Sequence, residues 1–329
     1  MTLSTSQPAS VPSISYAAAI ERATAEEMRR DETVIYMATN PPPALVAEFG
    51  ATRVRRTPIS ESAVTGMCIG AAGSGLRPIA HWANATFGFV AFDQVVNQAA
   101  KIRYMFGGQQ DFPIVLRALS GGGLRLAAQH SQSPYAIYAH IPGLKIILPA
   151  TPEDARGLMT SAIRDNNPVI SFEPARLATE EGPINDDGAS IPLGVASTPR
   201  SGDHVTIVAL GYMVKLALEA ADHLATDGIG AEVIDPRTIV PLDLETIRAS
   251  VLRTRRLVVV DEAPAMCSVA SEIVARICSD ADTFAQLQHA PVTVNGHGVP
   301  IPYSPVLEDF VLPSTDRIVA AARRALGAE

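Results

Sequence analysis

Leu144–Glu173 reads LKIILPATPEDARGLMTSAIRDNNPVISFE and decides the fold class of this chain. Apolar, β-branched runs at Leu144–Pro149 and Val169–Glu173 flank a helical pattern at Pro152–Asp165. Thr151 can cap that helix, a proline suits its first position, and acids follow in the first turn. A strand, a helix and a second strand in this order predict a crossover between parallel strands. We therefore expect an α/β domain built on a parallel sheet.

The same alternation of short apolar strands with longer Ala-rich helices runs upstream as far as Thr33. Near-continuous apolarity within the strands is typical of a parallel sheet that is covered on both faces. The expected strands, besides the two above, are Val34–Met37, Pro78–Trp82 and Pro113–Leu119. The expected helices, besides Pro152–Asp165, are Glu61–Ala72, Phe89–Met105 and Ser133–His140.

A second α/β pattern follows a break in the first. From Pro174 to Asp203 the chain is rich in Gly, Pro, Asp and Ser, which predicts a linker. The alternation then resumes with apolar runs at Val205–Leu210, Ala231–Ile234, Leu257–Asp261, Val269–Cys278 and Val292–Val294, and with helices at Val214–Asp227, Leu244–Thr254 and Asp316–Ala325. We expect two parallel-sheet, three-layer α/β domains, at residues 14–174 and 204–329, a linker at 175–203, and a polar, disordered arm at 1–13.

Composition and charge narrow the class of protein. Hydrophobic residues make up 47% of the 329 residues and charged residues 18%, which suits buried cores. The net charge of −8 includes no long basic tract, so we expect no nucleic-acid partner. No apolar run approaches the roughly 20 residues that cross a bilayer, and the first residues lack the features of a signal peptide. Three cysteines without CxxC spacing fit a reducing compartment, so we expect a cytoplasmic protein with no membrane partner.

Glycine-rich segments do not form a self-contained nucleotide site, because none reads GxGxxG or GxxxxGK[ST]. Gly70–Gly75 is explained by the end of a helix. Gly121–Gly123 stands at the carboxyl end of a predicted strand, where backbone has to approach something closely or adopt a positive φ. Ligands of open α/β sheets bind at such strand ends. His130, a few residues further on, is expected at the same edge.

Single residues at this edge have ordinary structural explanations when taken alone. Glu61 follows Ser60, a plausible N-cap, and the helix dipole favours an acid there by roughly 0.3–1 kcal/mol. His130 alone is more often a hydrogen-bonded structural histidine, and Phe87 alone is more often a core residue. A function for these residues therefore needs a wider pattern.

Six segments occur in an order that carries such a pattern. They are TPISES (Thr57–Ser62), FDQVVNQAAKIRYMFGG (Phe92–Gly108), GGGLRLAAQHSQS (Gly121–Ser133), HIPGLKIILPATPEDARGLMTSAIRDNNPV (His140–Val169), DPRTIVPLD (Asp235–Asp243) and PIPYSPVLE (Pro300–Glu308). Together they resemble the β subunit of the thiamine-diphosphate-dependent E1 component of 2-oxoacid dehydrogenases, including the pyruvate and acetoin enzymes. The resemblance covers nearly the whole chain after the N-terminal arm.

The resemblance implies a transketolase-like pyrimidine-binding domain followed by a transketolase C-terminal domain. Such a β subunit pairs with an α subunit as α2β2. In the family, the α chain carries the GDG…NN signature that binds the diphosphate and Mg²⁺, and this sequence lacks that signature. The expected activity is decarboxylation of a pyruvate-like 2-oxoacid, or cleavage of acetoin, with transfer of the acyl group to a lipoylated E2 acyltransferase.

The resemblance also implies roles for single residues. Glu61 matches the glutamate that activates the coenzyme through N1′ of its aminopyrimidine, a role that requires an apolar partner surface to desolvate the carboxyl. Ile59 and Phe87 match coenzyme-binding positions, with Phe87 stacking on the pyrimidine. His130 matches a histidine that faces the reaction intermediate or the incoming lipoyl group. The positions of a structural potassium ion in some relatives are matched by Ile114, Ala162, Asp165 and Asn167.

One departure from the family pattern leaves the substrate open. Relatives have an acidic GE[ED]V-type turn after the first strand, where this chain has Thr39-Asn40-Pro41-Pro42-Pro43. Two other functions remain as alternatives. The chain could belong to a two-chain thiamine enzyme of transketolase or synthase type, or it could be a non-catalytic scaffold subunit. The presence of Glu61 argues against the scaffold.

Overall fold

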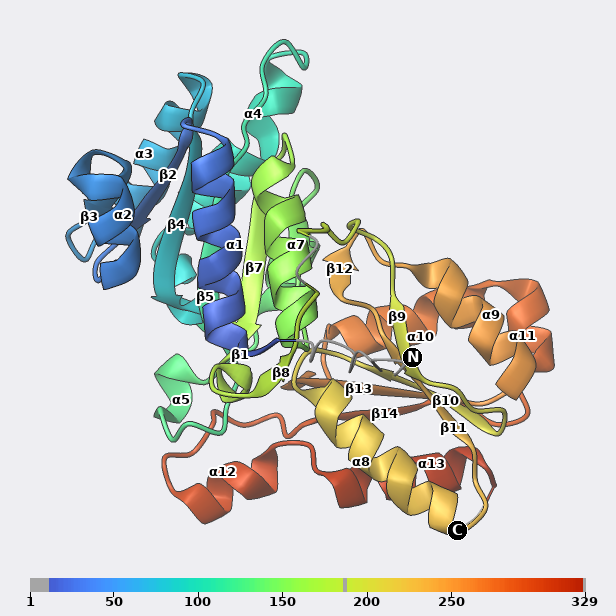
Figure 1. The fold of residues 1–329 in the computed structure, drawn as a ribbon. Helices are drawn as coiled ribbons and strands as arrows, with labels where there is room; N and C mark the ends of the chain where they lie inside the picture. The colour runs from blue at the N-terminus through green and yellow to red at the C-terminus, as the bar shows by residue number, and fades with distance from the viewer. Residues whose placement is uncertain (1–11, 186–187, 328–329) are drawn as a thin grey trace, which may run out of the picture.

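Two mainly parallel sheets, each covered by helices on both faces, make up the structure, a computed structural model that describes residues 12–185 and 188–327 (Figure 1). The predicted α/β class is confirmed. Most of the predicted N-terminal arm, residues 1–11, lies outside the described residues. Ser13, its last residue, begins strand β1 (Ser13–Ser15), which pairs antiparallel with β8 (Glu181–Pro183).

The first sheet has seven strands in the order β12-β6-β7-β5-β4-β2-β3. Its parallel strands are β2 (Val34–Ala38), β3 (Val54–Arg56), β4 (Arg77–Asn84), β5 (Val115–Ser120), β6 (Lys145–Ile147) and β7 (Val169–Pro174). All five strands predicted in this part are confirmed. The short β3 was missed, because two of its three residues are exposed arginines and it shows no apolar run.

Helices of the first sheet form two layers. One layer consists of α1 (Tyr16–Arg30), α2 (Pro43–Arg53) and α7 (Pro152–Arg164), and the other of α3 (Glu61–Gly73), α4 (Ala100–Met105) and α6 (Tyr135–Ala139). The helix predicted at Phe89–Met105 is confirmed over residues 92–105, where the π-helical η2 (Gln94–Ala99) continues directly into α4. Its start is three residues later than predicted, and the separate 3₁₀ helix η1 (Ala85–Phe89) precedes it. Gly88 of η1 packs closely against Trp82 and Tyr138, as described below.

The second sheet has five strands in the order β14-β13-β10-β11-β9. They are β9 (Ser197–Arg200), β10 (Val205–Ala209), β11 (Ala231–Asp235), β13 (Leu257–Pro264) and β14 (Val292–Gly296). One face is covered by α8 (Met213–Thr226) and α13 (Thr315–Ala325), and the other by α9 (Leu244–Thr254) and α10 (Val269–Ser279). Two shorter helices are α11 (Ala281–Gln286) and α12 (Pro305–Val311).

The run Val269–Cys278, which the alternation grouped with the strands, is helix α10. Ser268 caps this helix by accepting a hydrogen bond from the Ser271 backbone N–H. Its buried residues include Val269, Ile273 and Ile277, which recur at helical spacing rather than alternating.

Each sheet includes one short strand from outside the predicted domain that forms the rest of that sheet. β9 lies in the predicted linker and adds to the second sheet, antiparallel to β11. β12 (Thr238–Val240) comes from the second half of the chain and pairs antiparallel with β6 of the first sheet. One apolar core also runs across the junction, since it contains Ile170 of the first sheet and Val259 of the second. The relative position of the sheets is therefore set by packing and by strand pairing.

Gly143, in the turn after α6, allows that turn to approach the backbone of Ala100 at the start of α4. It has a φ of +100°, and an added Cβ would lie 1.9 Å from the carbonyl oxygen of Ala100. Gly75 has a similar φ of +91° but nothing within 4 Å of the added Cβ. An alanine at position 75 therefore carries only the cost of the left-handed backbone, whereas an alanine at position 143 carries that cost and the cost of a clash.

We predict that Gly75→Ala lowers the free energy of unfolding by about 1–2 kcal/mol, the cost of a left-handed alanine. Gly143→Ala should cost a further 1–3 kcal/mol, roughly the penalty of overpacking, because the backbone of Ala100 has to move. Chemical denaturation of the two variants measures the difference. Equal losses would show that residues 100 and 143 do not pack as described.

Candidate active site at the carboxyl edge of the first sheet

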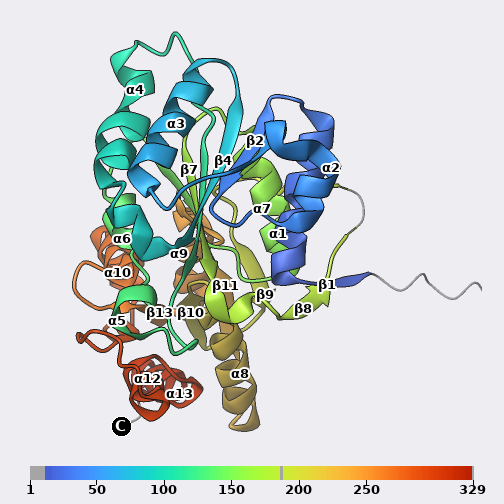
Figure 2. The same ribbon diagram turned by 90° about the vertical axis from the view of Figure 1, so that its left-hand side faces the viewer.

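Three of the predicted site residues follow strands that lie close together in the first sheet. Glu61 begins α3 shortly after β3, Phe87 lies in η1 after β4, and His130 ends α5 (Ala127–His130) after β5. The strands run parallel, so their carboxyl ends meet at one edge. Figure 2 shows α3 and α5 on the same side of the molecule. This edge is where ligands of open α/β sheets bind.

Direct contacts connect the segments that carry these residues. The rings of Phe87 and His130 meet edge to face, with centroids 5.2 Å apart and planes at 79°. The Thr86 hydroxyl donates to the backbone carbonyl of Gln129, at 2.6 Å. The Ser62 hydroxyl donates to the carbonyl of Val90, which connects the start of α3 to the segment after η1. The structure thus brings Phe87 and His130 together and ties the residue next to Glu61 to the same region.

The side chain of Glu61 is half-buried. Within residues 12–185 and 188–327, its carboxylate forms no hydrogen bond and no ion pair. Ser60 is the N-cap residue of α3, as predicted, but its side chain makes no capping hydrogen bond. The Ile59 side chain beside it is 81% exposed. A carboxylate without an internal partner is available to a ligand.

His130 offers a second unpartnered group. Its Nδ1 is buried, and nothing in the described residues forms a hydrogen bond with it. Buried polar atoms are rarely left unpaired in folded proteins, and an exception needs an explanation such as a missing ligand. A ligand that is bound at this edge could supply the partner.

The residues that follow Phe87 pack into a cluster of aromatic rings that was not predicted from the sequence. A Cβ added at Gly88 would lie 2.6 Å from the Trp82 ring and 2.7 Å from the Tyr138 hydroxyl, so only glycine fits there. The ring of Phe89 stacks on that of Tyr138, with centroids 6.4 Å apart. Burial raises the pKa of the Tyr138 phenol. The sequence Phe87-Gly88-Phe89 was the available signal, because a glycine between two aromatics indicates tight ring packing.

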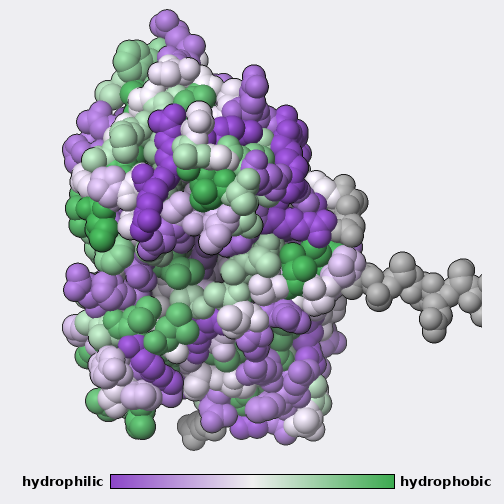
Figure 3. Space-filling model, turned by 60° about the vertical axis from the view of Figure 1, so that its left-hand side comes forward, coloured by the Kyte–Doolittle hydropathy of each residue, from purple (hydrophilic) through white to green (hydrophobic). Residues whose placement is uncertain are grey.

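Large apolar side chains are exposed on the helices and loops around this edge. They are Ile59, Met67, Phe89, Val90, Leu124 and Leu126. Figure 3 shows apolar patches on this side of the molecule, separated by polar stretches. Exposed apolar patches bordered by polar residues are typical of surfaces that a partner covers.

Gly121–Gly123 confirms the prediction that this loop needs glycine. Gly121 and Gly123 have φ values of +88° and +95°. A Cβ added at Gly121 would lie 2.3 Å from Glu262, and one added at Gly123 would lie 2.3 Å from Arg176. Glu262 belongs to β13, so the group that approaches the loop is part of the second sheet.

The residues expected to bind potassium already have side-chain cations as partners. Arg77 donates to the backbone carbonyl of Asp165 at 3.0 Å, and Lys145 lies 2.5 Å from its carboxylate. Arg103 donates to the side-chain oxygen of Asn167 at 2.5 Å. These bonds give those oxygens partners within the chain, which disfavours a potassium ion there.

The remaining two residues of that prediction are ordinary backbone positions. Ile114 is fully buried, and its carbonyl accepts a hydrogen bond from the Val169 N–H at 2.8 Å. Ala162 is buried in the last turn of α7.

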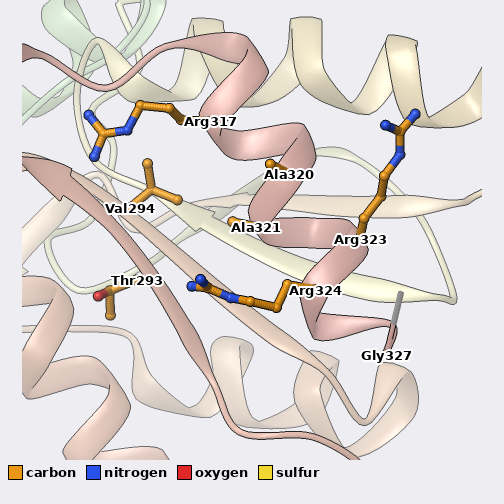
Figure 4. Close-up of a pocket in the computed structure, with 8 residues that line it drawn as sticks. All are labelled: Thr293, Val294, Arg317, Ala320, Ala321, Arg323, Arg324 and Gly327. Carbon is orange, nitrogen blue, oxygen red and sulfur yellow. The ribbon is translucent and has the colours of Figure 1, made fainter. Parts of the chain in front are cut away.

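A cavity of about 730 Å³ lies elsewhere, between α13 and β14 (Figure 4). It is lined mainly by arginines and small residues: Thr293, Val294, Arg317, Ala320, Ala321, Arg323, Arg324 and Gly327. Arg317 donates to the carbonyl of Asn295, and Arg323 pairs with Asp227. None of the predicted site residues lines this cavity.

None of the described helices is both long enough and apolar enough to span a bilayer.

Comparisons with known proteins match both halves of the chain to families. Residues 12–180 match the family described as "Transketolase, pyrimidine binding domain", and residues 194–318 match "Transketolase, C-terminal domain". A solved structure described as "Split gene transketolase, inactive beta4 tetramer" superimposes with a TM-score of 0.76. It covers 95% of this chain and 98% of its own at 22% identity, which shows the same fold.

Curated relatives are considerably closer in sequence. The β subunit of acetoin:2,6-dichlorophenolindophenol oxidoreductase from Bacillus subtilis is 47% identical, over 86% of this chain and 82% of its own. The protein of the same name from Cupriavidus necator is 45% identical, over 94% and 96%. The pyruvate dehydrogenase E1 component subunit beta from Rickettsia bellii is 43% identical, over 93% and 96%.

We predict that exchanging potassium for sodium at constant ionic strength leaves the thermal midpoint unchanged. An ion that binds only the folded chain would raise the midpoint with its concentration. Arg77→Gln, in contrast, should lower the midpoint equally in both salts, because the carbonyls of Ile163 and Asp165 lose their shared donor. A thermal midpoint that rises with potassium and not with sodium would show that the chain binds potassium.

Proposed function

The chain belongs to the thiamine-diphosphate-dependent E1 β subunits of pyruvate and acetoin dehydrogenases, and we propose that its first sheet forms one wall of a coenzyme pocket that an α subunit completes. This family consists of oxidoreductase subunits that act together with an α chain. The proposed substrate is a pyruvate-like 2-oxoacid or acetoin. A lipoylated E2 is the proposed acceptor of the acyl group, and Mg²⁺ and the diphosphate are proposed to be held by the α subunit.

The observation that carries the proposal is the meeting of Phe87 and His130 at the edge where Glu61 begins α3. Glu61 and His130 each present a polar group that lacks a partner in the described residues. Such groups suit a pocket that is filled by a coenzyme. The exposed apolar residues around the edge suit burial by a second subunit.

Bound thiamine diphosphate would supply a carbon nucleophile and an electron sink for breaking a bond beside a carbonyl group. Glu61 would hold a proton at N1′ of the aminopyrimidine ring, in a site that the α subunit desolvates. Phe87 would orient the ring by stacking. His130 would donate a proton to, or orient, the reacting oxygen of the substrate.

A cytoplasmic location is also proposed. The cysteines of the chain, Cys68, Cys267 and Cys278, are all free. Free thiols suit a reducing compartment.

The test is co-expression with an α chain that carries GDG…NN, followed by assay with thiamine diphosphate, Mg²⁺ and 2,6-dichlorophenolindophenol as electron acceptor. We expect turnover of a 2-oxoacid or acetoin by the complex. Glu61→Ala should lose at least about 100-fold in turnover, because the group that acts on the coenzyme is removed. It should still fold and assemble, since the carboxylate has no internal partner among the described residues.

Glu245→Ala is the matched control, because Glu245 is also an acid in the first turn of a helix, α9. It should retain normal turnover. Near-normal turnover of Glu61→Ala would refute the role assigned to Glu61.

The acceptor is tested separately by adding a lipoylated acyltransferase domain to the active complex. We expect acylation of the lipoyl group, detected as a mass increase, because E1 activity of this family ends in acyl transfer. Transfer only to an aldehyde acceptor would instead favour a transketolase or synthase type of enzyme.

A further inference from the structure

The loop that carries His130 is bound at both of its ends by one carboxylate of the second sheet. Glu262 accepts a hydrogen bond from the backbone N–H of Gly122, at 3.0 Å. Its other oxygen accepts from the hydroxyl of Ser133, at 3.2 Å. Arg176 completes the site, because its guanidinium lies 3.3 Å from Glu262. The start and the end of the loop are therefore joined through a side chain that is far away in sequence.

A second carboxylate binds the middle of the same loop. Glu308 of α12 has no exposed side-chain surface. It accepts hydrogen bonds from the backbone N–H groups of Gly123, at 2.7 Å, and Arg125, at 3.2 Å. The Arg125 guanidinium also pairs with it at 2.8 Å. Figures 1 and 2 both show α5 beside α12.

The loop needs this support because its backbone is in unfavourable conformations. Besides Gly121 and Gly123, the non-glycine residues Arg125 and Ala127 have φ values of +60° and +58°. Left-handed conformations of such residues persist only where the surrounding structure holds them. Ala127 is also the first residue of α5, which ends at His130. The direction of α5 therefore depends on a backbone that the carboxylates hold.

We propose that Glu262 of β13 and Glu308 of α12 are positioning residues of the active site, which hold His130 against Phe87. The inference rests on the proposed function, because it takes His130 to be the group that meets the substrate. Glu61 is on α3 and touches neither carboxylate. The two residues should therefore control the step that uses His130 and not the activation of the coenzyme by Glu61.

The experiment compares Glu308→Gln and Glu262→Gln in the assembled α–β complex. A neutral amide keeps the size of each side chain but loses the charge that receives the backbone N–H groups. Turnover should fall at least about tenfold, since small displacements of a reacting group cost large factors in rate. Exchange of the coenzyme C2 proton, followed by NMR, should stay as in the wild type.

Glu232→Gln is the matched control, because Glu232 is a buried glutamate of β11 that pairs with Arg253 and is remote from the loop. Its turnover should remain normal. Ser133→Ala is a milder variant that removes only one hydroxyl from the Glu262 site, and it should lower turnover by a smaller factor. This variant keeps the test decisive if a glutamine variant does not assemble.

A double variant distinguishes positioning from general destabilisation. In a His130→Ala background, Glu308→Gln should cause no further loss of turnover, because the group that it positions is absent. Multiplied losses in the double variant, or normal turnover of Glu308→Gln and Ser133→Ala, would overturn the proposal. A wild-type complex without turnover or C2 exchange would instead contradict the proposed function.

Discussion

Two buried carboxylates, Glu262 of β13 and Glu308 of α12, accept hydrogen bonds from backbone N–H groups of the glycine loop after β5, and the proposed site depends on this interaction. A buried carboxylate is costly unless it is fully hydrogen-bonded. Here the partners are backbone N–H groups, of Gly122 for Glu262 and of Gly123 and Arg125 for Glu308. The first glycine, Gly121, is needed because a Cβ there would lie 2.3 Å from Glu262, whereas Gly122 and Gly123 avoid Leu312 and Arg176.

The charges of this chain fall into two groups with different physical roles. Arg117 and Glu173 are an example of the first: they are buried, they pair at 2.7 Å, and the pair is satisfied within the chain. Glu61 and His130 form the second group, because each has a polar group without a partner among the described residues. The first group is satisfied within the fold, whereas we propose that the second contacts a ligand at an edge with exposed apolar side chains.

Local patterns predicted much of the fold but none of the long-range contacts. The strands of the first sheet and the capped helix α7 were evident, because apolar runs and caps are local signals. Helix α1 was missed, although its buried face recurs at helical spacing, and the π-helical η2 could not be foreseen. For the site, the resemblance pointed to Phe87 and His130, which do meet. The bond from Gly123 to Glu308 spans 185 residues, and no local pattern indicates it.

The central claim is that this chain supplies half of a coenzyme pocket, and calorimetric titration with thiamine diphosphate and Mg²⁺ tests it most directly. The account predicts no tight, saturable binding to the purified chain alone, and tight binding in proportion to the number of α–β pairs once an α subunit is present. Tight, stoichiometric binding to the single chain would contradict it.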